Sequence, residues 1–265
     1  MLDGLDLSNR ASSVDRIHTP GCPSFFRSKL GSSSRGLASL SAVVPYNPTM
    51  PIPIALYVPN VLGYTRMILA FLGLAFVDQP WTALSLWIAA ALLDLVDGPL
   101  ARLLSQTSQF GILLDVVADN VLRTCVWIAA ASLDRSMGPL AAGCVCLEWT
   151  TMIATQLHAQ GGEHWKQART QDPVWIQSFF ASNFRNPLGI WGLLGLFGAN
   201  MVAYGRSFPE VEMRVPHLDV LWYFFLSGRL LSMIIELWFC VGYASHVLQQ
   251  DAQAKRKDAD TKKKD

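Results

Sequence analysis

Six apolar stretches, each about as long as a helix that crosses a lipid bilayer, dominate the chain. They run over 53–77, 82–104, 110–133, 138–158, 187–204 and 218–247. A helix needs about 20 apolar residues to cross about 30 Å of hydrocarbon. Inside lipid the backbone polar groups must be satisfied within the segment, and a helix achieves this. The pattern therefore predicts an all-α fold, a polytopic membrane helix bundle with six transmembrane helices.

The composition favours a protein of the lipid bilayer over one with a large soluble core. Only 15% of the 265 residues are charged, whereas soluble domains usually have about a quarter. The mean hydropathy is +0.29. Because the formal net charge is only +1, no long-range field attracts a polyanion, and we expect no nucleic-acid partner.

The chain divides into three parts by composition. Residues 1–48 are rich in Ser, Gly, Arg and Pro without apolar periodicity, which predicts a disordered N-terminal tail. Within this tail, residues 16–44 contain no acid and weakly resemble a transit peptide, but the acids before them favour a cytosolic tail instead. Residues 49–248 form the predicted transmembrane domain, and residues 249–265 form a basic C-terminal tail.

Four carboxylates lie inside the second and third apolar stretches, at Asp94, Asp97, Asp115 and Asp119. Acids at membrane depth are costly and are usually functional. Spacings of three and four residues place each pair on one helix face, and the short link 103–110 makes the two helices antiparallel neighbours. Carboxylate oxygens suit Mg²⁺ or Mn²⁺, and two such ions would clamp a pyrophosphate. The acids therefore predict a two-metal site that handles phosphates at a membrane.

Small and basic residues between the acids indicate a bound ligand. Gly98 and Ala101 extend the first acidic helix face and have almost no side chain, which leaves room for a ligand near the backbone. Arg102 can form a forked contact with a phosphate oxygen. Asp119, at the end of the array, is the candidate catalytic base, because an acid only partly engaged with metal can take a proton from an attacking hydroxyl.

Basic residues beside the last apolar stretch indicate how the bundle is oriented. The tail contains Lys255-Arg256-Lys257 and Lys262-Lys263-Lys264, and positive charge flanking a span favours the cytoplasmic side. Six spans would place the N-terminus on that side too, together with the link between the second and third stretches. We therefore expect a multi-pass integral membrane protein with both termini and the active site cytoplasmic.

The full pattern, Asp-x2-Asp-Gly-x2-Ala-Arg-x8-Gly-x3-Asp-x3-Asp, resembles that of the CDP-alcohol phosphotransferase family. The chain matches every fixed position, namely Asp94, Asp97, Gly98, Ala101, Arg102, Gly111, Asp115 and Asp119. The resemblance implies six transmembrane helices and a two-metal site at the cytosolic end. It also implies transfer of a phosphatidyl or similar group from a CDP-linked donor to an alcohol, with release of CMP. All four acids would be metal ligands, with Asp119 also the base.

The same resemblance implies which residues hold the CDP-lipid. These are Asn60, Arg66, Gly98, Ala101, Arg102 and Gly111. The segment Val58-Pro59-Asn60-Val-Leu-Gly63-Tyr64-Thr65-Arg66 is similar to the first helix of eukaryotic phosphatidylinositol synthases. That similarity implies CDP-diacylglycerol as the donor, myo-inositol as the acceptor and the endoplasmic reticulum as the location.

The residue after the fourth acid does not identify the acceptor alcohol. Phosphatidylinositol synthases usually have Arg there, whereas this chain has Asn120, and its next basic residue is Arg123. Ala118-Asp119-Asn120 is closer to phosphatidylglycerophosphate or cardiolipin synthases, which usually have Pro where this chain has Val116. Alternative acceptors are therefore glycerol 3-phosphate, phosphatidylglycerol or an amino alcohol. A membrane carrier and a non-catalytic lipid-binding relative are further alternatives, although a carrier has no need of the Asp-Gly-x-x-Ala-Arg element.

Ionisable residues outside the motif each have two interpretations. Glu148, Arg229 and Glu236 either line an acceptor pocket or form contacts within the helix bundle. Lys166 and Arg185, in the connection 159–186, either meet a lipid phosphate or are ordinary interfacial cations.

A stripe of small residues indicates close helix packing. Gly192, Gly195 and Gly198 are three residues apart and share one helix face. Such a face lets two helix backbones approach each other. The contact lies either inside one bundle or at the seam of a homodimer.

Overall fold

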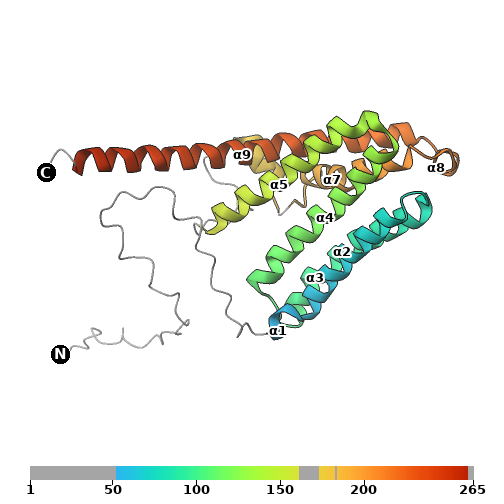
Figure 1. Cartoon of the computed structure of the whole chain (residues 1–265), viewed down its shortest axis with the longest axis horizontal. Coiled ribbons are helices and arrows are strands. Elements are labelled where there is room, and N and C mark those ends of the chain that lie inside the picture. Colours follow the sequence, from blue (N-terminus) through green and yellow to red (C-terminus); the bar gives the residue numbers. More distant parts are fainter. Residues whose placement is uncertain (1–51, 161–172, 183, 262–265) are drawn as a thin grey trace, which may run out of the picture. The chain divides into compact units, whose positions relative to one another are not determined.

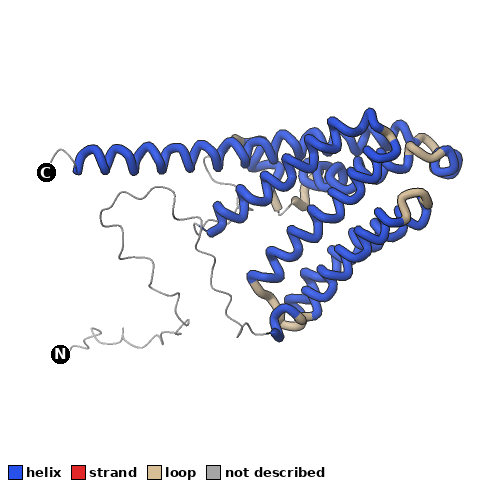
Figure 2. The backbone as a smooth tube through the Cα atoms, in the orientation of Figure 1, coloured by secondary structure: helices blue, strands red, loops and turns tan. Residues whose placement is uncertain are grey.

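The fold is helical throughout the part of the chain that the structure describes. The structure is a computed structural model and describes residues 52–160, 173–182 and 184–261. The predicted tail 1–48 lies outside these ranges. Figures 1 and 2 show the helices and their connections, and no strand occurs in these ranges. In chain order the elements are α1 (Ile52–Ala55), α2 (Val58–Ala75), α3 (Pro80–Leu103), α4 (Gln109–Leu133), the 3₁₀ helix η2 (Arg135–Met137), α5 (Gly138–Gln160), α6 (Val174–Phe180), α7 (Pro187–Gly205), α8 (Pro209–Arg214) and α9 (Leu218–Thr261). The predicted all-α class is confirmed.

Five helices in the described ranges are long and apolar enough to cross a bilayer, by length and composition. They are α2, α3, α5, α7 and α9. The remaining predicted span corresponds to α4, which has 25 residues. It contains Asp115, Asp119 and Arg123 close together, and these charges lower its apolarity without shortening it. The structure therefore supports five spans, and membrane crossing by α4 stays a prediction.

Prolines and capping side chains set where several helices begin. Proline occupies the first turn of α2, α3 and α7, where its missing N–H has no helical partner to lose. Ser108 caps α4, because its Oγ accepts a hydrogen bond from the Gly111 N–H at 3.0 Å. Asn186 caps α7 in the same way through the Gly189 N–H, at 2.8 Å. The Ser108 cap fixes the start of α4 about two turns before the first of its two acids.

Helix α2 packs against both α3 and α4, which touch each other over a shorter stretch. The α3–α4 link folds onto the start of α2, because Gln106 Oε1 accepts a hydrogen bond from the Val58 N–H at 3.0 Å. The sequence predicts α3 and α4 as direct neighbours, and the structure adds α2 as a third wall beside them (Figure 1). The acids of α3 and α4 therefore face α2 as well as each other.

An aromatic core joins α2, α3 and α7 away from the acids. Trp87 is fully buried, and its Nε1 donates to the Ala70 carbonyl at 3.1 Å. Its ring meets Tyr204 edge-on, with centroids 4.8 Å apart, and the Tyr204 hydroxyl donates to the Val77 carbonyl at 2.7 Å. Gly73 leaves the space for this indole, since a Cβ there would lie 2.2 Å from Trp87 Nε1. The core fixes how α2 lies on α3.

The glycine stripe of α7 packs against α9 of the same chain. A Cβ on Gly195 would lie 2.2 Å from the Arg229 backbone nitrogen, and one on Gly198 would lie 2.4 Å from the Phe225 ring. A Cβ on Gly192 would lie 2.6 Å from the Phe179 ring of α6 and 2.9 Å from the Ser232 hydroxyl of α9. The stripe is therefore occupied inside one bundle, so it supplies no seam for a homodimer. The close approach also fixes the position of Arg229 on α9.

Replacing Gly195 with alanine is expected to destabilise the bundle by about 1–3 kcal/mol, as overpacking of a filled core does. The added Cβ would overlap the backbone of α9, which cannot move aside as a flexible side chain can. Thermal unfolding of the purified protein in detergent measures the effect. Gly143→Ala is the matched control, because a Cβ there meets no atom within 4 Å. Equal unfolding midpoints for the two variants would contradict the packing described above.

Candidate active site

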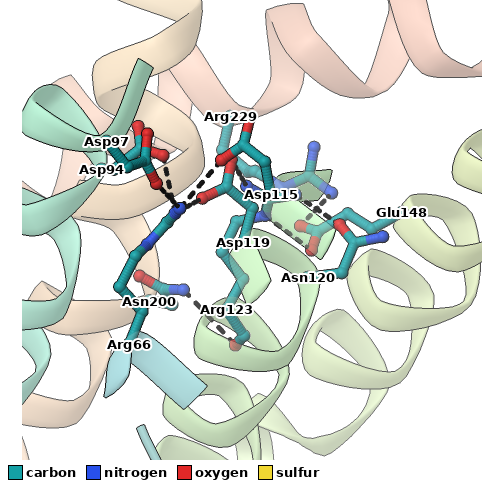
Figure 3. Close-up of polar contacts among 10 residues, drawn as sticks. All are labelled: Arg66, Asp94, Asp97, Asp115, Asp119, Asn120, Arg123, Glu148, Asn200 and Arg229. Atoms are coloured by element: carbon teal, nitrogen blue, oxygen red, sulfur yellow. Dashed lines mark hydrogen bonds and ion pairs between the residues drawn. The ribbon is translucent and has the colours of Figure 1, made fainter. Parts of the chain in front are cut away.

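Four acids from α3 and α4 surround one arginine from α2 (Figure 3). Arg66 Nη2 lies 2.7 Å from Asp94 Oδ1. Its Nη1 donates to Asp97 Oδ2 at 2.9 Å and to Asp115 Oδ1 at 2.8 Å. Asp119 Oδ1 accepts a further hydrogen bond from Nη2. The predicted convergence of the four acids, which we call the acid cluster, is therefore present in the structure.

Electrostatic repulsion explains why an arginine lies at the centre of the acid cluster. Four ionised carboxylates and one guanidinium leave a surplus of three negative charges. The planar fork of arginine allows each terminal nitrogen to serve two acids at once. The Arg66 side chain is fully buried, and its Nε has no hydrogen-bond partner. Arg66, which the sequence assigns to the CDP-lipid, thus contacts the acids directly.

Three of the acids offer a donor set for a divalent cation. Asp94, Asp97 and Asp115 each contribute one carboxylate oxygen, and these oxygens lie within 4.8 Å of one another. Such hard oxygen donors are those that Mg²⁺ and Mn²⁺ prefer, and the surplus negative charge favours a dication. The residues present therefore fit the predicted metal. Asp119 lies outside this group of three but shares Arg66 with it.

A cavity of about 300 Å³ opens beside the acid cluster between α2, α3 and α4, and we call it the Gly98 cavity. Two acids, Asp97 and Asp115, form part of its wall. The remaining wall includes five of the six residues predicted to hold the CDP-lipid, namely Asn60, Gly98, Ala101, Arg102 and Gly111. The structure thus gathers these residues around one space next to the acids. Arg66, the sixth, lies among the acids instead.

Two glycines of the Gly98 cavity have different roles. A Cβ on Gly98 would meet only the Arg102 guanidinium, at 3.9 Å, so packing does not require glycine there. A Cβ on Gly111 would lie 2.8 Å from Asn60 Oδ1, so this glycine lets α4 approach α2. The Asn60 amide nitrogen in turn donates to the Ile54 carbonyl at 2.6 Å. Gly98 therefore keeps the cavity wall open, and Gly111 supports the packing behind it.

A second cavity, of about 260 Å³, adjoins the acid cluster and extends toward α5, α6 and α9. We call it the Glu148 cavity. Asp115 lines both cavities, whereas Asp97 lines the Gly98 cavity and Asp119 lines the Glu148 cavity. Its aromatic wall is formed by Phe179, Phe180, Phe184 and Phe239. The two cavities therefore meet at the acid cluster.

Two arginines and two glutamates form a continuous chain of ion pairs at the Glu148 cavity. Arg123 Nε donates to Glu148 Oε2 at 3.0 Å, and Arg123 Nη1 lies 3.6 Å from Asp119 Oδ2. Arg229 Nη2 lies 3.0 Å from Glu148 Oε1, and Arg229 Nη1 donates to Glu236 Oε2 at 2.8 Å. We call Arg123, Glu148, Arg229 and Glu236 the four-charge network. It connects α4, α5 and α9 and reaches the acid cluster through Asp119 (Figure 3).

The network resolves several alternatives that the sequence leaves open. Glu148 and Glu236 form ion pairs inside the bundle and also line the Glu148 cavity. Arg123 is absent from the predicted site residues, although its position one turn after Asp119 is the signal that identifies it. Arg185 is exposed and lines neither cavity. Lys166 lies outside the described residues.

Residues 56–182 match the family model for CDP-alcohol phosphatidyltransferase. This segment runs from the start of α2 to the end of α6 and contains the acid cluster, Arg66, Arg123 and Glu148. The match covers just under half of the chain and supports a CDP-alcohol phosphatidyltransferase domain there. The resemblance stated from the motif is thereby confirmed. Arg229 and Glu236 lie beyond this domain, on α9.

Several curated proteins are similar to part of the chain. The rat and human CDP-diacylglycerol–inositol 3-phosphatidyltransferases are each 39% identical over 74 residues, which is 28% of this chain and 35% of each relative. The CDP-diacylglycerol–glycerol-3-phosphate 3-phosphatidyltransferase of Cereibacter sphaeroides is 43% identical over 72 residues, covering 24% of this chain and 32% of that protein. The chain thus spans about a third of the length of these relatives. No solved structure matches it.

Proposed function

We propose that the protein transfers a phosphatidyl group from CDP-diacylglycerol to myo-inositol and releases CMP. One observation carries this proposal: two separate cavities meet at a cluster of four acids, with Asp115 in the wall of both. A transferase needs adjoining places for donor and acceptor, with the reacting phosphorus between them. The transferase names of the relatives and the matched domain support the same chemistry.

The donor belongs in the Gly98 cavity. The open wall at Gly98 leaves room for the flat cytidine or the diphosphate close to the backbone. The Arg102 guanidinium, also in this wall, can bind a phosphate oxygen through two parallel hydrogen bonds. Asn60, Ala101 and Gly111 complete the proposed CDP-lipid site. Arg66 contributes to this site indirectly, because it holds the neighbouring acids together.

Asp119 is the proposed base, because it is the acid at the end of the cluster that lines the Glu148 cavity. Its carboxylate takes the proton from the acceptor hydroxyl. The hydroxyl oxygen then bonds to the phosphatidyl phosphorus while the bond from that phosphorus to the CMP oxygen breaks. CMP departs with the electron pair of this bond, and the phosphatidyl group stays on the acceptor.

Asp94, Asp97 and Asp115 are the residues that would hold Mg²⁺ or Mn²⁺, with Asp119 as the further ligand of a two-metal site. Bound there, the cations would neutralise the pyrophosphate and stabilise the negative charge that develops on CMP. Arg66 has a different role, because it contacts all four acids and offsets part of their own negative charge. It keeps the carboxylates together despite their mutual repulsion.

The names of the relatives favour myo-inositol as the acceptor. Glycerol 3-phosphate is the second candidate, because the Cereibacter relative is named for it. The proposed setting is the bilayer of the endoplasmic reticulum, with the termini and the active site on the cytoplasmic side. A homodimer stays a prediction that the glycine stripe does not support.

Removal of divalent cations is expected to lower CMP release below detection. Without them, no metal ion at the acids would neutralise the pyrophosphate of the donor. The test uses the purified full chain in lipid nanodiscs with CDP-diacylglycerol and a panel of alcohols. CMP is measured by chromatography and the lipid product by mass spectrometry, with EDTA and then with Mg²⁺ or Mn²⁺ restored.

The same experiment separates the proposed transferase from its rivals. A carrier or a non-catalytic lipid-binding protein would release no CMP with any alcohol, and that outcome would overturn the proposal. The mass of the lipid product distinguishes inositol from glycerol 3-phosphate as the preferred acceptor.

A further inference from the structure

We propose that the four-charge network makes the Glu148 cavity selective for an uncharged polyhydroxy alcohol and excludes alcohols that carry a net charge. This inference rests on the proposed function, because it treats the cavity as the acceptor site. It adds the physical basis of acceptor choice, which the motif residues do not contain. It also assigns that choice to Arg123, Glu148, Arg229 and Glu236.

The network is internally balanced, with two guanidinium and two carboxylate groups. Arg123 is the one cation among the described residues that line the cavity, and it is paired with Glu148 and with Asp119. Arg229 lies behind the wall with no exposed surface, between Glu148 and Glu236. A phosphate in this cavity would meet no arginine without carboxylate partners. An ammonium would meet network carboxylates that are already paired.

Both kinds of ion would therefore enter at a cost. Interactions between charges are strong where water is excluded. A charged acceptor would lose its hydration on entering the cavity and would gain no unpaired group of opposite charge to compensate for that loss. An uncharged alcohol avoids that penalty. The surplus charge of the acid cluster does not alter this argument, because the metal ions of the proposed reaction would offset it.

Two buried polar atoms of the cavity wall match a hydroxyl group. Glu148 Oε1 and Asn120 Nδ2 have no hydrogen-bond partner in the structure, although Oε1 lies near Arg229 as an ion pair. Their residues are 3% and 2% exposed, so solvent does not satisfy them fully. One is an acceptor and the other a donor, which are the two hydrogen-bonding roles of a hydroxyl. Neighbouring hydroxyls of a polyol suit such a pair.

The remaining wall also suits a small polyol. The hydroxyls of Thr155 and Ser232 donate to backbone carbonyls, which leaves their oxygens free to accept from a ligand hydroxyl. The Phe179, Phe180 and Phe184 rings supply an apolar surface for the C–H groups of the acceptor. The volume of about 260 Å³ lies below the range of about 300–1,000 Å³ that is usual for drug-sized ligands. The cavity therefore has room for a small alcohol.

The test compares acceptors that differ in charge. Wild-type protein in nanodiscs with CDP-diacylglycerol and Mg²⁺ receives myo-inositol, glycerol, inositol 1-phosphate, glycerol 3-phosphate or ethanolamine. We expect lipid product from the uncharged alcohols, at a kcat/KM for myo-inositol at least about 100-fold above that for each charged alcohol, as unfavourable charge placement predicts. Glu236→Gln removes one negative charge without changing the size of the side chain. This variant should raise the kcat/KM ratio of inositol 1-phosphate to myo-inositol by about tenfold, because the cavity wall then has one negative charge fewer to repel the phosphate.

Glu212→Gln on α8 is the matched control, because Glu212 is exposed and lines neither cavity. Its acceptor ratios should equal those of the wild type. If Glu236→Gln fails to fold, Glu148→Gln tests the charge balance of the four-charge network in the same way. The comparison of charged and uncharged alcohols with the wild-type protein tests the inference without either variant. Product from a charged alcohol at a rate comparable to myo-inositol would overturn the inference and leave the transferase in place. Absence of product from every alcohol would overturn the proposed function and the inference with it.

Discussion

Asp119→Asn is expected to lower the turnover of phosphatidyl transfer by about 10²–10⁴-fold, the range attributed to a general base. Asparagine keeps the shape of the side chain and can still accept the hydrogen bond from Arg66. It cannot take a proton from the acceptor hydroxyl at neutral pH. The loss should therefore appear in kcat rather than in binding of the donor. CMP release at saturating CDP-diacylglycerol and myo-inositol measures kcat, and the rise in unfolding temperature on adding CDP-diacylglycerol measures donor binding.

Asp134→Asn is the matched control for this variant. Asp134 accepts a hydrogen bond from the Ser136 N–H at 2.9 Å in the turn after α4, and it lines neither cavity. Its activity should equal that of the wild type. Full turnover by Asp119→Asn would remove Asp119 from the role of base and leave the acid cluster as a binding site alone.

Arg66→Gln is expected to produce the largest loss of stability. The change leaves four acids without the guanidinium that all of them contact. Removing one partner of a fully buried ion pair typically costs about 3–5 kcal/mol. Because the acids here are partly exposed, water compensates some of their charge, and the loss should lie near the lower end of that range. In a bundle of this size the unfolding midpoint should fall by about 10 °C. Thermal unfolding in detergent with EDTA measures this fall, and Mg²⁺ or Mn²⁺ should recover part of it by supplying positive charge to the same acids.

Arg102→Gln is the comparison for Arg66→Gln. Arg102 is exposed and lines the Gly98 cavity, so its stability change should stay within about 0.5 kcal/mol, as for other surface positions. Its effect should appear in donor affinity instead. Equal unfolding midpoints for wild type and Arg66→Gln in EDTA would contradict the central place of Arg66 in the acid cluster.

The helices and the acid motif could be predicted from sequence because both depend on local spacing. Apolar runs of bilayer length must become helices in lipid, and the acids at 94, 97, 115 and 119 fall on helix faces at spacings of three and four. The short α3–α4 link also makes their convergence predictable. Composition alone did not establish the number of spans, because the charged residues of α4 reduce the apolarity by which a membrane span is recognised.

The contacts of Arg66 and of the glycine stripe could not be predicted in the same way. Arg66 belongs to a motif that suggests phosphate binding, and only the packing of α2 against α3 and α4 brings it to the acids. The stripe at Gly195 fits a packed bundle or a dimer equally well by sequence. The α9 backbone lies so close to Gly195 that a Cβ there would be 2.2 Å from it, and this contact assigns the stripe to the bundle.

By itself the sequence determined the helical class and the grouping of the acids, because repeats of three and four residues and bilayer length are properties of single helices. Only the tertiary structure decided which charges meet. Glu148 and Arg229 are about 80 residues apart in the chain and belong to different helices. Their contact depends on how α5 and α9 cross, and side-chain spacing along one helix contains no information about that crossing. The Glu148 cavity and its ion pairs were therefore visible only once the helices were packed.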